Sequence, residues 1–293
     1  IKSEGWRGKS RGTSLLTPHM YLSCGKFKLD LSRPLIMGIV NVTPDSFSDG
    51  GLHATTEAAI AHALRLIEEG ADILDIGGES TRPGSMPVAL DEELKRVLPV
   101  LEGLKHVNVP LSADTQKPEV MREALRAGAS MINDVNALAA AGALQAVAKS
   151  NAAVCLMHKQ GELLTMQVNP QYHDVVAQIK AFLGSRVEAA LAAGIARERI
   201  VIDPGFGFGK TVEHNLALLR NLEQFRELGV PLLVGLSRKS ALGKIAGRPT
   251  GERIYSSMAA ALIAVMKGVK IVRVHDVGAT RDALAVYRAV SSE

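Results

Sequence analysis

A loop rich in small, polar and acidic residues follows the first apolar run of the chain, residues 35–40. Pro44 and the glycine pair at 50–51 interrupt this segment, so it continues neither as a strand nor as a helix. Such a loop can close over a polar ligand, with Phe47 as the apolar contact and carboxylates such as Asp49 as charged ones. An ordinary surface loop would explain any one of these residues, but the same arrangement recurs along the chain.

Seven further short apolar runs also end in polar or charged side chains. In chain order, the residues at the eight ends are Asn41, Asp75, Asp114, Asn133 with Asp134, His158, Asp203, Ser237 with Lys239, and Arg273 with His275. Asp114, Asn133 and Asp203 offer the acceptors that the amino and ring N–H groups of a planar, amide-like heterocycle require. A sugar could use similar groups, and helix capping is the structural alternative for the two aspartates.

Cationic groups indicate an anion site. The segment 79–84 combines the hydroxyl of Thr81, the guanidinium of Arg82 and a turn ending in glycine, a set that can bind phosphate. Arg273 and His275 are two residues apart, so they project to one side of a strand. A lone histidine is more often a core residue, but beside Arg273 phosphate binding is favoured. By position alone, Lys239 also belongs with this anion.

The glycine-rich segment 203–211 is not a nucleotide-binding loop. A Walker loop requires glycine where the chain has Pro204, and a Rossmann loop requires glycine where it has Lys210. What remains is a carboxylate, Asp203, followed by a loop in which Phe208 could lie against a flat heterocycle.

The apolar runs alternate with segments of helical periodicity. The predicted strands are 35–39, 73–76, 111–114, 131–134, 153–157, 200–203, 232–235 and 271–274. The predicted helices are 56–69, 92–104, 119–127, 175–193, 212–228, 252–267 and 280–290. Eight repeats predict an α/β fold, a single-domain (β/α)8 TIM barrel with its chemistry at the carboxyl ends of the strands. An open doubly wound sheet is the alternative, and it predicts one crevice at a reversal of strand order.

Composition narrows the classes of partner. Aromatic residues make up only 4% of the 293 residues, which argues against stacking platforms for single-stranded nucleic acid. Most of the +4 charge comes from the first eleven residues, so we expect no nucleic-acid partner. No apolar run has the length of a membrane span, so we expect no membrane partner.

The two cysteines and the start of the chain give weaker expectations. Cys155 lies inside an apolar run, so a buried free thiol is favoured over a disulfide with Cys24, and a cytoplasmic location is expected. Residues 1–23 are expected to be an N-terminal extension of uncertain origin, and residues 24–293 to form the barrel.

Seven ordered segments resemble those of bacterial dihydropteroate synthases, the pterin-binding TIM barrels. They are 38–51, 75–84, 112–120, 155–161, 203–210, 235–240 and 273–277. The resemblance implies that p-aminobenzoate is joined to 6-hydroxymethyl-7,8-dihydropterin pyrophosphate, giving 7,8-dihydropteroate and pyrophosphate in folate biosynthesis. It also implies Mg²⁺ as cofactor, a homodimer, and sulfonamides as competitors for the aminobenzoate site. Lys159 and Tyr255 depart from the usual pattern.

The resemblance assigns roles residue by residue. The pterin contacts that it implies are Asp114, Asn133, Met157, Asp203, Phe208 and Lys239. The pyrophosphate contacts are Asn41, which also binds Mg²⁺, and Thr81, Arg82, Arg273 and His275. The residues that shape the aminobenzoate pocket are Phe47, Pro83 and Ser240. The catalytic residues are Asp49, Lys239, Arg273 and His275. The resemblance thus assigns Lys239 to the pterin, whereas its position alone assigned it to the anion.

Two other functions fit parts of this pattern. A methyltetrahydrofolate-binding methyltransferase barrel would share the pterin pocket, but it has no need of the pyrophosphate contacts at Arg82, Arg273 and His275. A non-catalytic pterin-binding subunit would not need the loop carboxylates. Turnover would separate both of these from a synthase, whose loops at 41–51 and 79–84 are expected to close and exclude water.

Overall fold

The computed structural model describes residues 21–43 and 51–291, and its centre is a sheet of eight parallel strands. The strands are β3 (Leu35–Asn41), β4 (Ile73–Gly77), β5 (Leu111–Asp114), β6 (Met131–Asp134), β7 (Ala153–Met157), β8 (Ile200–Asp203), β9 (Leu233–Val234) and β10 (Ile271–Val274). Their order is β8-β7-β6-β5-β4-β3-β10-β9, and a parallel bridge between Ile202 and Leu232 joins the two ends. The sheet therefore closes on itself, which confirms the predicted (β/α)8 barrel and rules out the doubly wound alternative.

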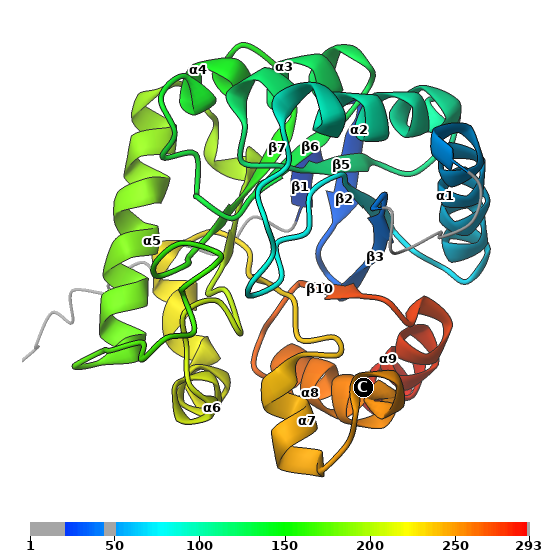
Figure 1. Cartoon of the computed structure of the whole chain (residues 1–293). Helices are drawn as coiled ribbons and strands as arrows, with labels where there is room; N and C mark the ends of the chain where they lie inside the picture. The colour runs from blue at the N-terminus through cyan, green and yellow to red at the C-terminus, as the bar shows by residue number, and fades with distance from the viewer. Residues whose placement is uncertain (1–20, 44–50, 292–293) are drawn as a thin grey trace, which may run out of the picture.

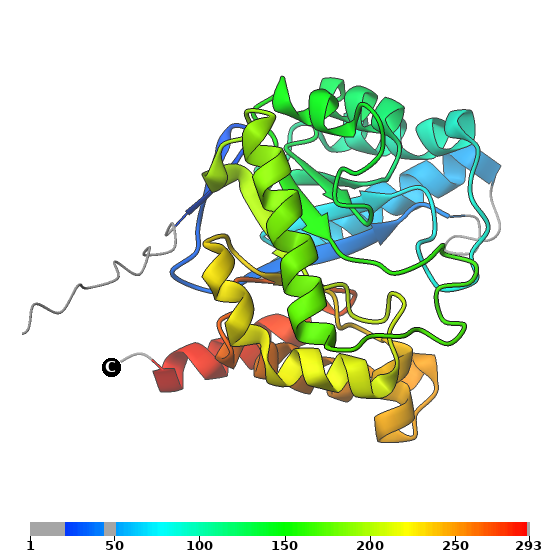
Figure 2. The same cartoon turned by 90° about the vertical axis from the view of Figure 1, so that its left-hand side faces the viewer.

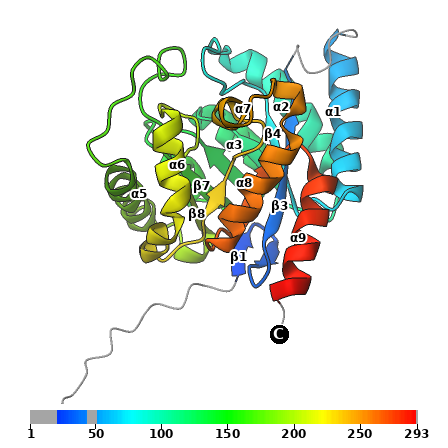
Figure 3. The same ribbon diagram turned by 90° about the horizontal axis from the view of Figure 1, so that it is seen from below.

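Helices surround the sheet, as Figures 1 and 3 show. They are α1 (Gly51–Glu68), α2 (Leu90–Leu104), α3 (Pro118–Arg126), α4 (Ala143–Ala148), α5 (Val175–Ala192), α6 (Val212–Arg220), α7 (Ser240–Ala246), α8 (Ile254–Met266) and α9 (Val277–Ser291). Short 3₁₀ segments are η2 (Arg197–Arg199), η3 (Leu222–Leu228) and η4 (Thr250–Glu252). In the described part of the chain, no helix is both long enough and apolar enough to cross a bilayer.

One predicted helix is divided in the structure. The segment 212–228 was expected to be continuous, but α6 ends at Arg220 and the 3₁₀ segment η3 follows it. Asn221 leaves the helical conformation at φ −116° and ψ 22°, and its side-chain amide donates to the carbonyl of Ala217 at 2.8 Å. This local hydrogen bond competes with continuation of the helix. Helices α4 and α7 were not predicted, because six and seven residues are too short to give a clear period.

An antiparallel hairpin covers the amino-terminal end of the barrel. It consists of β1 (Tyr21–Cys24) and β2 (Phe27–Asp30), and Figure 2 shows it at the end opposite the long loops that follow the strands. Leu22 and Cys24 are fully buried against the barrel interior, and the Cys24 thiol donates to the carbonyl of Ser130 at 3.2 Å. The hairpin was not predicted, and the expected division after residue 23 falls inside β1. Both cysteines are buried and free, as expected.

Two apolar layers hold the barrel together. One lies between strands and helices and includes Ile36, Leu66 and Leu101. The other fills the barrel interior and includes Met37, Met131 and Cys155. Strands buried on both faces are expected in a parallel sheet covered by helices. The interior is therefore a packed core, which leaves the carboxyl ends of the strands as the place for a ligand site.

Candidate active site

Arg273 joins the ends of three strands at the mouth of the barrel. Its Nε lies 2.5 Å from Oδ2 of Asp75 on β4, and its Nη2 lies 2.7 Å from Oδ2 of Asp114 on β5. Asn133 on β6 donates from Nδ2 to the same Asp75 oxygen at 3.0 Å. β4, β5 and β6 are neighbours in the sheet, so their carboxyl ends bring these groups together. Three predicted site residues thus form one cluster around Asp75, which is fully buried.

Burial controls the charge of this cluster. Loss of solvent raises the pKa of Asp114 to about 7, although the neighbouring Arg273 acts in the opposite direction. Burial alone would lower the pKa of Arg273, but Asp75 and Asp114 hold it above its usual value. Asp75 Oδ1 and Asp114 Oδ1 are buried and have no hydrogen-bond partner among the described residues. Unpaired buried acceptors are costly, so they favour a ligand that brings N–H donors.

A second part of the site places Lys239 against Phe208. The Lys239 ammonium lies 4.1 Å from the centroid of the Phe208 ring, within range of a cation–π interaction. Burial and the nearby Arg273 lower the pKa of Lys239 to about 8. Burial also raises the pKa of Asp203 to about 6, while the backbone N–H of Gly205, which donates to its Oδ1 at 2.7 Å, acts against this rise. The two predicted pterin contacts Asp203 and Lys239 are close enough for each to shift the pKa of the other.

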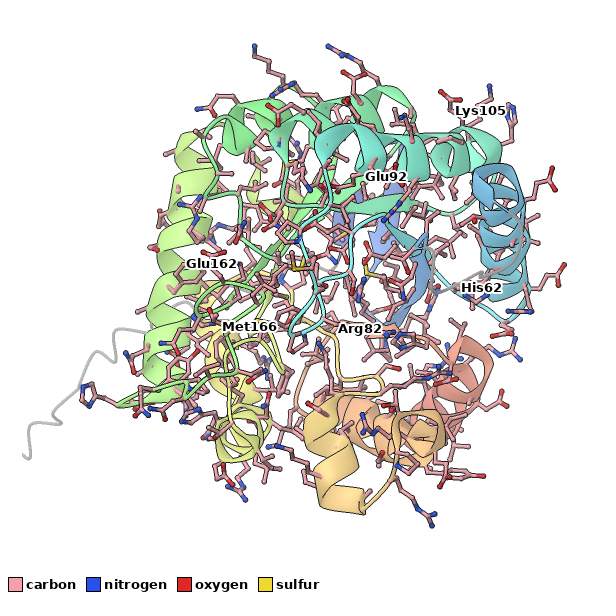
Figure 4. The ribbon with its side chains drawn as sticks, viewed as in Figure 1. His62, Arg82, Glu92, Lys105, Glu162 and Met166 are labelled. Carbon is pink, nitrogen blue, oxygen red and sulfur yellow. The ribbon has the colours of Figure 1, made fainter. Side chains whose placement is uncertain are left out.

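An apolar wall lines this part of the mouth. Phe208 and Met157 pack together with Val135, Leu163 and Met166 in one buried cluster. Phe208 and Met157 were predicted, but the last three were not. Leu163 and Met166 come from the loop after β7, shown with Met166 labelled in Figure 4. Only their apolar character within a polar segment could have indicated a wall rather than a surface loop.

Lys210 and His158 are buried next to this wall and contact each other. They are therefore not free to bind an anion at the mouth. The Lys210 ammonium donates to the carbonyl of Phe208 at 2.9 Å and lies 3.1 Å from Nδ1 of His158. Burial lowers the pKa of Lys210 to about 7, and burial together with Lys210 lowers that of His158 to about 3. His158, one of the predicted strand-end polar groups, therefore supports the loop that carries Phe208. The sequence pattern itself indicates no role for Lys210 beyond its misfit to a nucleotide loop.

His275 and Arg82 are the predicted anion-binding residues on the other side of the mouth. Burial and the charges of Arg273 and Arg238 lower the pKa of His275 to about 3, so its ring is neutral at pH 7. Ser237 Oγ accepts from the backbone N–H of His275 at 3.2 Å and lies 3.0 Å from its Nδ1. The serine hydroxyl proton can therefore be donated to Nδ1, which leaves the ring proton on Nε2. His275 can donate a hydrogen bond to an anion but adds no positive charge.

The remaining predicted residues surround this mouth or lie outside the described part. Arg82 is exposed on the loop after β4 (Figure 4), and its charge is felt by both Lys239 and His275. Thr81 and Pro83 flank it on the same loop, and Ser240 opens α7 directly after Lys239. Asn41 ends β3 beside Gly77 of β4. Phe47 and Asp49 lie outside the described residues. Asp134 accepts from the backbone N–H groups of Asn136 and Leu138 and stabilises a turn.

The chain is similar in sequence and in structure to known proteins. Residues 37–275 match the family described as pterin binding enzyme. The dihydropteroate synthase of Escherichia coli (strain K12) is 49% identical over 265 residues, covering 90% of this chain and 94% of that protein. Among solved structures, the Xanthomonas albilineans dihydropteroate synthase with 4-aminobenzoic acid has a TM-score of 0.89 and 55% identity, covering 94% of this chain and 100% of that one.

Two further structures carry other ligands. The same Xanthomonas albilineans enzyme in complex with 7,8-dihydropteroate has a TM-score of 0.86 and 53% identity, covering 93% and 99% of the two chains. The Yersinia pestis dihydropteroate synthase in a sulfonamide drug complex has a TM-score of 0.89 and 48% identity, covering 94% and 100%. The fold described above is therefore similar to these structures over nearly the whole chain.

Proposed function

The chain belongs to the dihydropteroate synthase family of pterin-binding enzymes, and we propose the following roles for the residues at its barrel mouth. It is a transferase of folate biosynthesis that condenses p-aminobenzoate with 6-hydroxymethyl-7,8-dihydropterin pyrophosphate. The products are 7,8-dihydropteroate and pyrophosphate. The observation that carries the assignment of roles is the buried cluster of Asp75, Asp114, Asn133 and Arg273, which lies at the same mouth as the Phe208–Met157 wall.

The pterin is held by acceptors and by the apolar wall. Asp114 and Asp203 accept from the ring and amino N–H groups, and the amide of Asn133 pairs with a neighbouring edge. Met157 and Phe208 lie against one face of the ring, and Lys239 donates to a ring acceptor. The unpaired buried oxygen of Asp114 supports this role, because a donor-bearing ring would satisfy it.

The pyrophosphate is held by donors of different kinds. Arg82 and Arg273 supply positive charge, while neutral His275 supplies an N–H group and Thr81 a hydroxyl. The C–O bond to the pterin methylene breaks with its electron pair remaining on pyrophosphate, and fixed donors stabilise the charge that develops there. The amine of p-aminobenzoate then forms the C–N bond and loses a proton. Asp49, for which stabilisation of the positive methylene is predicted, lies outside the described residues.

The aminobenzoate pocket is proposed beside the loops that carry Pro83 and Ser240, with Phe47 from the undescribed segment. Sulfonamides are proposed to compete there, in keeping with the sulfonamide complex of the Yersinia pestis relative. The 79–84 loop is joined to the loop after β7 by a hydrogen bond from the N–H of Gly84 to the carbonyl of Leu163 at 2.9 Å. This contact supports the proposal that these loops shield the reaction from water.

Magnesium is proposed as the cofactor, with Asn41 as its protein contact. The described residues contain no group of three His, Cys, Asp or Glu side chains that could hold a metal ion by themselves. Mg²⁺ commonly keeps several waters and binds one or two protein oxygens together with substrate phosphates, so a single amide oxygen at a strand end fits it. When bound, Mg²⁺ would neutralise charge on the departing pyrophosphate.

We also propose a homodimer and a cytoplasmic location. On α8, the exposed apolar residues Tyr255, Ile263 and Met266 lie at helical spacing, and Val286 and Val290 are exposed on the adjacent α9. Figure 3 shows these two helices side by side on one side of the barrel. A second copy would bury these exposed apolar side chains of α8 and α9. The two free cysteines support a reducing compartment.

The deciding experiment is turnover. We would mix the protein with p-aminobenzoate and the dihydropterin pyrophosphate, with and without Mg²⁺, and measure pyrophosphate and dihydropteroate together. Equal, Mg²⁺-dependent amounts of the two products are expected. Tight pterin binding without either product would instead favour a methyltransferase barrel or a non-catalytic subunit.

A further inference from the structure

A polar network behind the mouth joins three of the loops that follow strands. Lys117, directly before α3, donates from Nζ to Oε2 of Glu79 and, at 2.5 Å, to Oε2 of Glu93 on α2. Gln116 donates to the other oxygen of Glu79 at 3.3 Å and accepts from Asn136 at 2.7 Å. The loops after β4, β5 and β6 are therefore connected through side chains that have no part in the binding roles described above.

The charges of this network depend on one cation. Glu79 is 6% exposed and Glu93 is fully buried, and two such carboxylates would repel each other in a poorly solvated place. Within residues 21–43 and 51–291, Lys117 is the only cation that forms an ion pair with either of them. Burial acts to lower the pKa of Lys117, but Glu79 and Glu93 together raise it, so the ammonium remains charged at neutral pH.

Glu79 is also the inner end of the loop that carries Arg82. Of residues 79–84 it alone is buried, while Arg82, Pro83 and Gly84 are exposed. The remainder of the loop is braced internally, because the Ser85 hydroxyl donates to the carbonyls of Ser80 and Arg82 at 2.5 and 2.7 Å. Glu79 is the side chain that ties this loop to the loop after β5, whereas the contact from Gly84 N–H to the carbonyl of Leu163 involves backbone atoms alone. A loop that is stiff in itself is therefore positioned at its inner end by Glu79.

We propose that Glu79 is a positioning residue, which through its ion pair with Lys117 sets the 79–84 loop so that Arg82 reaches the pyrophosphate. This inference rests on the proposed function of the mouth. It assigns Glu79 no contact with substrate and no chemical step. Lys117 is the fixed point of the anchor, because it directly precedes α3, where its backbone carbonyl accepts from the N–H of Met121 at 3.0 Å.

The two carboxylates on Lys117 provide a matched pair of variants. Glu79→Gln keeps the shape of the side chain and an acceptor for Gln116, but it removes the charge that anchors the loop. Glu93→Gln makes the same chemical change on the same lysine, but on a helix that carries no substrate contact. We expect Glu79→Gln to weaken binding of inorganic pyrophosphate about tenfold and to lower kcat/KM for the dihydropterin pyrophosphate to a similar extent. Affinity for bare pterin should stay within about twofold of the wild type.

Glu93→Gln should leave all three quantities within about twofold of the wild type. Equal losses of pyrophosphate affinity in the two variants would overturn the proposal, because the network would then be a structural unit with no special connection to the loop. An unchanged pyrophosphate affinity in Glu79→Gln would also overturn it. Lys117→Arg, which keeps the charge, should retain more pyrophosphate affinity than Lys117→Met. The opposite order would contradict the proposal that the Glu79–Lys117 ion pair positions the loop.

Pyrophosphate binding by calorimetry does not depend on turnover, so this test is separate from the test of the proposed function. A wild-type protein that binds pyrophosphate and pterin but makes no product would overturn the synthase assignment alone. The unfolding midpoints of Glu79→Gln and Glu93→Gln should be measured beside these affinities. Similar midpoints with different pyrophosphate affinities are the result expected from a positioning role.

Discussion

The guanidinium of Arg273 lies 2.7 Å from the carboxylate of Asp114, so a residue predicted to bind the anion is paired with a residue predicted to bind the pterin. Asp75 shares the same guanidinium and also accepts from Asn133. The two halves of the site are thus physically connected in this structure. A pterin that binds the unpaired Oδ1 of Asp114 would share this carboxylate with Arg273, which holds Oδ2, and this gives a structural reason for the two halves to be coupled.

Replacing Arg273 with Ala should impair use of the pyrophosphate substrate more than binding of a bare pterin. The change removes a charged donor from the departing group, so we expect kcat/KM to fall by about 100-fold or more. It also leaves Asp75 and Asp114 without their shared partner, so a smaller loss of pterin affinity should accompany it. Steady-state rates and calorimetry with both ligands would measure this.

Asp203→Asn is the matching variant on the pterin side. It should weaken the binding of bare pterin by about tenfold or more while changing pyrophosphate affinity little, because Asp203 is proposed to accept from the pterin ring. If Arg273→Ala and Asp203→Asn lost both ligands to the same degree, the proposed division of the site would be wrong.

Asp203 should also make stability depend on pH. Its folded pKa of about 6 lies above the ordinary value of 3.8, so the folded state binds the proton more tightly than the unfolded chain does. Its contribution to stability is then fully present below about pH 4 and is lost as the pH rises through about 6. Asp203→Asn removes this pH-dependent loss. The free energy of unfolding of the variant minus that of the wild type should therefore be higher by about 2 kcal/mol at pH 8 than at pH 4. Urea unfolding at both values would measure the difference, and an equal effect of the substitution at both would contradict the raised pKa.

Removal of Mg²⁺ should stop turnover without releasing the pterin. In the proposed site Asn41 would supply a single oxygen and substrate phosphates and water the other ligands, so chelation should abolish pyrophosphate release while leaving bare pterin affinity within about twofold. Asn41→Ala should raise the Mg²⁺ concentration that gives half-maximal rate. Turnover that is insensitive to EDTA would argue against a metal at Asn41.

The apolar face of α8 and α9 should govern association. Tyr255 is 77% exposed, and Tyr255→Glu places a charge within the proposed contact, so sedimentation velocity should show a shift from dimer toward monomer. Leu64→Glu is the control, because Leu64 is 44% exposed on α1, a helix outside the proposed contact. A shift of equal size in both variants, or in neither, would contradict a dimer through α8 and α9.

By itself the sequence determined the barrel and most of the expected site. Strands such as Leu111–Asp114 and Ile200–Asp203 have the bounds that were predicted, because a short apolar run ending in a carboxylate is a local signal that tertiary contacts do not alter. The same signal selected Asp114, Asn133, Asp203 and Arg273. In a parallel barrel every such residue falls at the same end of the sheet, so chain order alone was enough to place them at one mouth.

Only the tertiary structure decided which charged side chains form ion pairs with each other. Arg273 meets Asp75 across 198 residues of chain, and Lys117 meets Glu79 across 38, so no local pattern could indicate either pair. The neutral state of His275 and the inward turn of His158 follow from burial, which depends on the packing of distant segments. Local periodicity fixes which elements form and which end of a strand is polar, whereas charge state and partnership depend on the solvent that the closed barrel excludes.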